Sequence, residues 1–178
     1  MNPRIATLKR TTGETDIALT LNLDGTGQSE IETGIGFLDH MLTALARHAR
    51  FDLKLSCVGD LDVDGHHTSE DCALVLGAAI DEALGDRRGI TRFGAAYCPL
   101  DGALARAVVD LSGRPAPVVN LGLRRERIGE MATENITHVF VSLANAARMA
   151  LHVDVLRGSN DHHRAEAAFK ALALALRE

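Results

Sequence analysis

The feature that most constrains this chain is the motif His-His-x-x-Glu, which occurs twice, at residues 66–70 and 162–166. On a helix, the first histidine of each motif lies four residues before the glutamate and the second histidine three, so each pair can converge on one metal ion. Adjacent histidines, however, point about 100° apart on a helix. One motif therefore cannot easily direct both imidazoles at one ion, which favours a two-metal arrangement in which each motif contributes to both sites.

The sequence around the motifs is also repeated. A shift of 98 residues places His40 on His138, and a shift of 96 residues places the first motif on the second. We infer an internal duplication of a sheet-plus-two-helix unit. The two repeats are expected at residues 1–86 and 87–178, which together form one compact domain of the α+β class.

Hydrophobic periodicity predicts where the secondary structure lies. Strands are expected at 15–23, 28–33, 52–58, 103–111, 118–123 and 151–156, and helices at 37–50, 68–84, 134–150 and, after a turn at 158–161, up to 176. The apolar stripe of the first helix leaves His40 off the core face. The turn signal Asp24-Gly25 predicts that the first two of these strands form an antiparallel hairpin, and Gly85 is expected to end the second helix.

Composition argues against several classes of partner. A net charge of −5, one Tyr, five Phe and no Trp leave neither a basic face nor stacking residues for nucleic acid. No apolar signal region or membrane-spanning run of about 18 residues is present, so we expect a cytoplasmic protein. The three cysteines are odd in number and form no C-x-x-C pair, so Cys57, Cys72 and Cys98 are expected to be reduced and buried.

The duplicated histidines and glutamates suit a pair of metal sites, each with three imidazole nitrogens and one carboxylate oxygen. The eight candidate ligands are His40, His66, His67, Glu70, His138, His162, His163 and Glu166. Ligation by nitrogen and oxygen without thiolate favours Mn, Fe, Co, Ni or Zn and does not choose among them. Six-coordinate ions would keep open positions for a substrate.

The residues alone leave two other functions open. A structural shell, whose ions only hold subunits together, predicts saturated coordination and no affinity for a small phosphate compound. A two-metal hydrolase of phosphate esters predicts bridging carboxylates and a water-rich site, whereas histidine dominates the candidate ligands of this chain.

Four segments carry a resemblance to a known family: residues 34–41 (Gly-Ile-Gly-Phe-Leu-Asp-His-Met), 64–71, 110–115 (Asp-Leu-Ser-Gly-Arg-Pro) and 160–172. They closely resemble imidazoleglycerol-phosphate dehydratase of histidine biosynthesis, and the likeness runs over essentially the whole chain. The resemblance implies that each half is a four-stranded mixed sheet with two helices, with the four helices sandwiched between the sheets. It also implies a homo-oligomer of 24 subunits built from trimers, with active sites shared between subunits.

The resemblance further implies two Mn(II) ions per active site and divides the eight ligands between them. One ion would be held by His40, His67, Glu70 and His162, and the other by His66, His138, His163 and Glu166.

The reaction implied is that of a hydro-lyase, which converts D-erythro-imidazole glycerol phosphate to imidazole acetol phosphate and water. We expect metal-bound imidazolate to expel hydroxide, giving a diazafulvene-like intermediate that then loses the proton on the adjacent carbon. Glu14 matches the family's substrate-contacting glutamate and is expected to transfer this proton. The residues expected to be catalytic are Glu14, His67, Glu70, His163 and Glu166.

Three cations match the family's substrate-binding positions, namely Arg92, Arg114 and Lys170, and the fork of an arginine suits phosphate. His48 is expected to touch the substrate without binding metal, and Asp101 is a further candidate. The expected substrate-binding set is Glu14, His40, His48, His66, His67, Glu70, Arg92, Arg114, His162, His163, Glu166 and Lys170. Family members commonly continue into a Ser-Thr-Lys segment that helps to hold phosphate, whereas the last residue of this sequence is Glu178. In the absence of a fused phosphatase domain, dehydration alone is expected.

Overall fold

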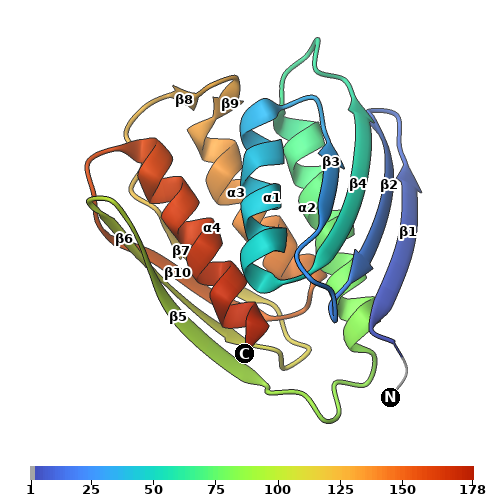
Figure 1. The fold of residues 1–178 in the computed structure, drawn as a ribbon. Coiled ribbons are helices and arrows are strands. Elements are labelled where there is room, and N and C mark those ends of the chain that lie inside the picture. Colours follow the sequence, from blue (N-terminus) through green and yellow to red (C-terminus); the bar gives the residue numbers. More distant parts are fainter. Residues whose placement is uncertain (1–2) are drawn as a thin grey trace.

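The computed structural model describes residues 3–178 as two four-stranded sheets with four helices packed between them (Figure 1). The first sheet contains β1 (Ile5–Thr11), β2 (Thr15–Asn22), β3 (Ser29–Glu32) and β4 (Asp52–Gly59), and the second contains β5 (Phe93–Leu100), β6 (Ala103–Asp110), β7 (Ala116–Asn120) and β10 (Ala150–Arg157). The helices are α1 (Gly36–Ala49), α2 (His66–Leu84), α3 (Thr133–Ala146) and α4 (Asp161–Arg177). A short ribbon of β8 (Arg127–Ile128) and β9 (Met131–Ala132) precedes α3. The expected α+β sandwich is thus confirmed.

The two sheets have the same topology. Their strand orders are β1-β2-β4-β3 and β5-β6-β10-β7, so corresponding elements follow one another in the same order in both halves. The likeness extends to backbone conformation: Arg50 after α1 and Arg148 after α3, which are 98 residues apart, have φ angles of 60° and 50°. Few non-glycine residues adopt this left-handed conformation. The position of the boundary between repeats at residue 86 stays a prediction.

The predicted antiparallel hairpin between residues 15–23 and 28–33, which form β2 and β3, is wrong. β2 pairs antiparallel with β1 on one side and with β4 on the other, which leaves no free edge for β3. β3 instead pairs parallel with β4, with Ile31 opposite Leu55. A parallel pair requires a crossover connection, which α1 supplies between the two strands.

The Asp52 carboxylate fixes the path of the chain into β3. Its Oδ1 accepts hydrogen bonds from the backbone N–H groups of Thr26, Gly27 and Gln28 at 2.8, 3.1 and 3.0 Å. These bonds hold the loop after β2 against the start of β4, and the hydrogen bonds from Gln28 and Thr26 lower the pKa of Asp52 despite the opposing effect of burial. The loop therefore leads away from β2 and does not fold back along it.

Besides the short strands β8 and β9, two strands of the main sheets, β1 and β5, escape prediction because their side chains lack the usual pattern. In β1 only Ala6 is buried, because β1 lies at the edge of its sheet. In β5 the large residues Phe93 and Tyr97 point outward, while the small residue Gly94 faces α4. A Cβ on Gly94 would clash with the backbone carbonyl of Ala175, so close approach of α4 dictates small inward residues. Periodicity read from large apolar residues cannot detect such a strand.

The four predicted helices are confirmed with shifts at their ends. α2 starts at His66 and not at Thr68, and Gly85, with a φ of 55°, ends it as expected. α3 ends at Ala146 and not at Ala150, because Arg148 takes the left-handed conformation and β10 begins at Ala150. His40 is exposed on α1, as expected. The cysteines are free and buried. Within residues 3–178, none of the helices has the length and apolarity that crossing a bilayer requires.

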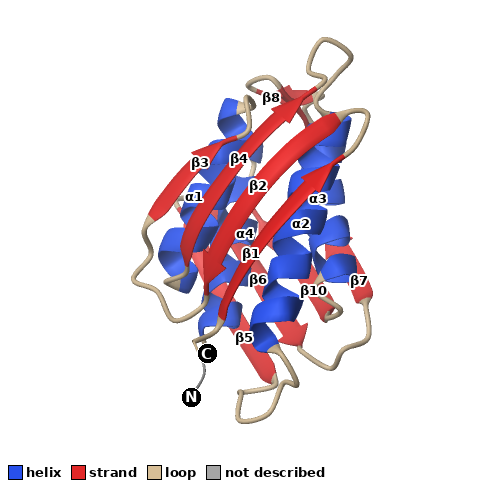
Figure 2. Cartoon of the chain, turned by 90° about the vertical axis from the view of Figure 1, so that its right-hand side faces the viewer, coloured by secondary structure: helices blue, strands red, loops and turns tan. Residues whose placement is uncertain are grey.

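All four helices begin at the same end of the sandwich and pack in two pairs, α1 with α4 and α2 with α3 (Figures 1 and 2). Each pair joins one helix from each half. The α2–α3 contact is close at Gly77, where an added Cβ would lie 2.5 Å from the carbonyl oxygen of Leu143 and 2.8 Å from the backbone nitrogen of Ala147. Glycine therefore sets the spacing between these two helices.

The substitution Gly77→Ala tests this contact. Alanine in a helix interior usually stabilises by up to about 1 kcal/mol relative to glycine, but here its Cβ would push against backbone, and we expect a net loss of about 2 kcal/mol. Denaturant unfolding of the metal-free protein measures the loss. Gly102→Ala is the control, since nothing lies within 4 Å of its Cβ position in an exposed turn. Equal stability of Gly77→Ala and the parent chain would contradict the close contact.

Candidate metal centre

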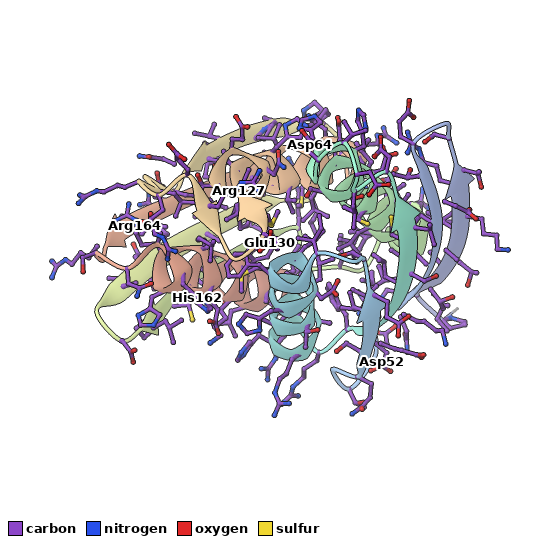
Figure 3. The ribbon with its side chains drawn as sticks, turned by 90° about the horizontal axis from the view of Figure 1, so that it is seen from above. Asp52, Asp64, Arg127, Glu130, His162 and Arg164 are labelled. Atoms are coloured by element: carbon purple, nitrogen blue, oxygen red, sulfur yellow. The ribbon has the colours of Figure 1, made fainter. Side chains whose placement is uncertain are left out.

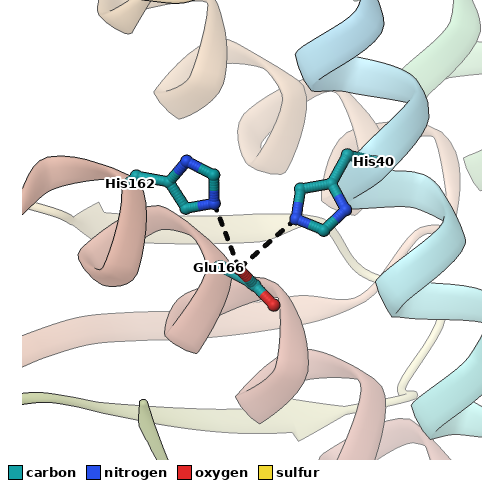
Figure 4. Close-up of side chains that lie close together, drawn as sticks. All are labelled: His40, His162 and Glu166. Atoms are coloured by element: carbon teal, nitrogen blue, oxygen red, sulfur yellow. Dashed lines mark hydrogen bonds and ion pairs between the residues drawn. The ribbon is translucent and has the colours of Figure 1, made fainter. Parts of the chain in front are cut away.

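Glu166 lies between two imidazoles that come from different helices (Figure 4). His162 Nε2, one turn earlier on α4, is 3.2 Å from Glu166 Oε2, and His40 Nε2 on α1 is 3.3 Å from the same oxygen. The spacing of four residues brings the first pair together, and the packing of α1 on α4 brings His40 across. The ligand atoms of the three residues lie within 4.8 Å of one another. We call this set the α1–α4 cluster.

The other oxygen of Glu166, Oε1, forms an ion pair with Lys170, whose Nζ lies 2.6 Å away. Burial alone would raise the pKa of Glu166, but the hydrogen bond and charge of Lys170, together with His40, outweigh it and lower the pKa. The carboxylate is therefore ionised at neutral pH, with Oε2 directed at the two imidazoles.

A second set of the same composition lies between α2 and α3, and we call it the α2–α3 cluster. His66 Nε2 is 3.4 Å from Glu70 Oε2, and His138 Nε2 is 3.3 Å from Glu70 Oε1. The two imidazole rings are stacked, with centroids 5.1 Å apart and planes inclined by 25°. Glu70 therefore uses one oxygen for each histidine, whereas Glu166 uses a single oxygen for both.

Asn135 orients His66 from behind. Its side chain is buried, with 5% of the residue exposed, and its Oδ1 lies 3.2 Å from His66 Nδ1. An amide oxygen only accepts hydrogen bonds, so this contact favours the tautomer of His66 with the proton on Nδ1. This arrangement leaves Nε2 as the ligand atom on the side of Glu70.

The two clusters fit divalent transition metals. Each offers two imidazole nitrogens and a carboxylate oxygen, a donor set typical of such ions. His138 Nε2 is buried and forms no hydrogen bond with any residue between 3 and 178, and a bound ion would satisfy it. The side chains of His40 and His66 are 47% and 45% exposed, so part of each site faces outward. Seen from above in Figure 3, His162 lies at the start of α4, at the end where all four helices begin.

His67 and His163 stand outside both clusters. His67 Nδ1 is 2.9 Å from Asp60 Oδ2, and His163 Nδ1 is 3.6 Å from Asp101 Oδ2. The hydrogen bond with Asp60 is the main reason that the pKa of His67 is raised. Within one chain, the first histidine of each motif thus joins a cluster and the second points elsewhere, as the angle between adjacent helical residues requires.

The glutamates are grouped differently within the chain from the expected division of ligands. Glu70 is expected with His40 and His162, but in the chain Glu166 occupies that place, and Glu70 lies with His66 and His138. The reason is helix pairing: each glutamate meets the histidine four residues earlier on its own helix and the histidine on the helix packed against it. The spacing of three residues between the second histidine and the glutamate is not used within the chain.

Two other predicted residues lie close to these motifs. Glu14 is exposed in the turn between β1 and β2; its backbone oxygen accepts a hydrogen bond from Asp60 N at 3.0 Å, and its charge helps to raise the pKa of His67. His48 is half-buried on α1, and its pKa is lowered by burial and by the charges of Lys170 and Arg47. Glu14 therefore lies near His67, and His48 lies near Lys170.

Arg92 and Arg114 are not brought to the clusters of their own chain. Arg92 pairs with Asp110 at 2.6 Å, where β5 begins and β6 ends, and Arg114 follows β6 as an exposed residue. Glu178 at the end of α4 accepts a hydrogen bond from Ala95 on β5, so this edge lies beside the last turn of α4. His162 is at the other end of that helix, which is about 25 Å long.

Sequence reasoning missed two residues that the structure places against candidate ligands, namely Asp60 and Asn135. Asp60 precedes His67 by seven residues in an acidic turn, and only the fold of that turn brings it to the imidazole. Asn135 precedes His138 by three residues, a spacing that places both on one face of α3 and could have served as a signal.

Comparison with known proteins agrees with the resemblance. The chain matches the family model described as "Imidazoleglycerol-phosphate dehydratase" over residues 33–176. An imidazoleglycerol-phosphate dehydratase from Candida glabrata is 55% identical over 192 residues, covering 98% of this chain and 91% of that protein. One from Phytophthora nicotianae is 63% identical over 174 residues, covering 98% of this chain but only 38% of that longer protein.

Solved structures are similar over nearly the full length. The crystal structure of imidazoleglycerol-phosphate dehydratase from Staphylococcus aureus has a TM-score of 0.88 and 38% identity, covering 97% of this chain and 96% of that one. The enzyme from Pyrococcus furiosus, solved in complex with (S)-C348, has a TM-score of 0.83 and 38% identity, covering 96% and 91%. The chain belongs to the imidazoleglycerol-phosphate dehydratase family.

Proposed function

We propose that this chain, a hydro-lyase by its family, converts D-erythro-imidazole glycerol phosphate to imidazole acetol phosphate and water with two Mn(II) ions per active site. The observation that carries the proposal is the pair of clusters, each with two imidazoles and a carboxylate whose ligand atoms lie within 4.8 Å. A family assignment that rests on nearly the whole chain supports the substrate. When bound, the ions supply Lewis-acid chemistry for the substrate's imidazole ring and departing hydroxyl.

His67 and His163 complete metal sites in neighbouring subunits. Their side chains are 43% and 33% exposed, they point away from the clusters of their own chain, and the Nδ1 atom of each faces a carboxylate. Such a carboxylate leaves Nε2 as the ligand atom. With His67 and Glu70 meeting His40 and His162 across a subunit boundary, and His163 and Glu166 meeting His66 and His138, each ion would have three nitrogens and one oxygen. The expected assembly of 24 subunits built from trimers would supply these neighbours.

Glu14 moves the proton in this proposal. Its carboxylate is exposed in the turn between β1 and β2 and lies on the same side as His67, so it would reach a substrate bound at the ion that His67 helps to hold. Asp60 holds His67 in place through Nδ1. A carboxylate beside the reacting carbon can accept its proton directly.

The phosphate group would be bound by Lys170 together with Arg92 and Arg114. Lys170 and its neighbour His48 lie at the α1–α4 cluster of their own chain. The two arginines lie at the other end of the helix layer, so they would serve the site of an adjacent subunit. Arginine forks suit phosphate oxygens.

Metal removal tests the proposal as a whole. Treatment of the assembled protein with a chelator should abolish dehydration and loosen the oligomer, because ligands from different subunits share the ions. Ultraviolet absorbance of the enolised keto product and sedimentation velocity measure the two effects, and added Mn(II) should restore both. Release of inorganic phosphate without ketone formation would contradict dehydration and favour phosphate-ester hydrolysis.

The substitution Glu14→Gln tests the proton-transfer role. We expect turnover to fall by a factor of about 100 or more, with an unchanged metal content, because the amide keeps the shape of the side chain but cannot take up a proton. Product formation and elemental analysis measure the two quantities. Glu82→Gln, in an exposed position near the end of α2, is the control. Near-normal turnover of Glu14→Gln would remove this residue from the reaction.

A further inference from the structure

We infer that Asp71 is a positioning residue for Glu14, whose turn it holds against the start of α2 through a chain of hydrogen bonds. This inference rests on the proposed role of Glu14 in proton transfer. Asp71 follows Glu70 directly on α2 and is buried. Its carboxylate contacts β1 and β2, the two strands that flank the turn carrying Glu14.

The Asp71 carboxylate binds both strands of this hairpin. Thr15, at the start of β2, donates a hydrogen bond from Oγ1 to Asp71 Oδ2 at 2.5 Å, and the guanidinium group of Arg10, near the end of β1, forms an ion pair with the same oxygen. Thr15 is buried as well. Hydrogen bonds between buried groups are strengthened because water does not compete for them. Asp71 therefore fixes the end of the hairpin against α2.

The chain of hydrogen bonds continues from Thr15 to the backbone of Glu14. Because the Thr15 hydroxyl gives its hydrogen to Asp71, the Thr12 hydroxyl donates to Thr15 Oγ1, at 3.2 Å. Thr12 Oγ1 in turn accepts hydrogen bonds from the backbone N–H groups of Glu14 and Thr15, at 3.2 and 3.0 Å. A hydroxyl has a single hydrogen to donate, so Asp71 sets the direction of each bond in the chain.

The backbone carbonyl of Glu14 is held from the other side. Asp60 N donates a hydrogen bond to Glu14 O at 3.0 Å, and Asp60 Oδ2 lies 2.9 Å from His67 Nδ1. Both backbone groups of Glu14 are therefore connected to α2, one through Asp71 and the other through Asp60 and His67. The expected division of ligands places His67 and Glu70 at the same ion, so a single chain would set the distance between that ion and the carboxylate that accepts the proton.

In the other half of the chain, apolar residues take the places of these polar groups. The residue 96 positions after Asp71 is Ala167, and the first residue of β6, which corresponds to Thr15 at the start of β2, is Ala103. Both alanines are buried. A buried ion pair adds little net stability compared with apolar packing, so stability alone does not account for the network in the first half. The network accompanies the turn that carries Glu14.

Steady-state kinetics of the Mn(II)-loaded enzyme test the inference with Thr15→Val, which keeps the shape of the side chain but cannot donate to Asp71. We expect kcat to fall about 10-fold with KM and metal content unchanged, because a misplaced Glu14 weakens the transition state and not substrate binding. Thr15→Ser, which keeps the hydroxyl, should retain kcat. Asp16→Asn is the matched control, since it alters an exposed hydrogen bond from Thr11 in the same hairpin.

The double variant Glu14→Gln with Thr15→Val separates positioning from folding. If Thr15 acts through Glu14, adding Thr15→Val should lower the turnover of Glu14→Gln no further, whereas a disturbance of the fold would lower it again. The pair Thr15→Ala with Asp71→Ala, which gives this half the alanines of the other, should behave as Thr15→Val does in both backgrounds.

An equal loss of turnover with and without Glu14→Gln, or a lower Mn(II) content of Thr15→Val, would overturn the inference. A normal kcat of Thr15→Val beside an impaired Glu14→Gln would overturn the inference alone. Near-normal turnover of Glu14→Gln would instead overturn the proposed proton-transfer role, and the inference with it.

Discussion

A carboxylate held between two imidazoles from different helices is the interaction on which the rest of this structure depends. Glu70 and Glu166 each meet one histidine on their own helix and one on the helix packed against it. The spacing of four residues supplies the first contact, but the second requires two helices at a fixed distance and in a fixed register. The close approach at Gly77 and the sheets on either side supply that distance.

Duplication explains why such a site occurs twice, and later divergence explains why the two copies differ. The histidines, the glutamates and even the left-handed arginines after α1 and α3 coincide between halves. The residues around them do not: a lysine replaces a leucine beside one glutamate, and an asparagine replaces a phenylalanine behind one histidine. The two halves therefore share the cluster residues and differ in the residues that orient or pair with them.

The parts of the fold and site that depend on local spacing could be predicted from the sequence. The helices of the site, the exposure of His40 and the six residues of the two clusters all follow from periodicity and repetition. Pairing of elements far apart in sequence could not be read in the same way. The turn at Asp24 suggested a hairpin between β2 and β3, but β3 pairs with β4. The inward face of β5 carries small residues such as Gly94, so it lacks the apolar pattern of a strand. The grouping of the glutamates within the chain could not be predicted for the same reason. Each glutamate could meet the histidine three or four residues before it, and the packing of the helices determines that it meets the one four residues before.

The dominance of histidine at this end of the molecule has an electrostatic reason. All four helices begin here, and each helix start carries a partial positive charge of about half a unit. Cations bind poorly at such a place unless negative charge offsets the dipoles, and Glu70 and Glu166 supply it. Further carboxylates would repel one another at this short range, whereas a neutral imidazole donates an electron pair to a metal without adding charge. Two glutamates with several imidazoles therefore suit the binding of cations beside four helix starts.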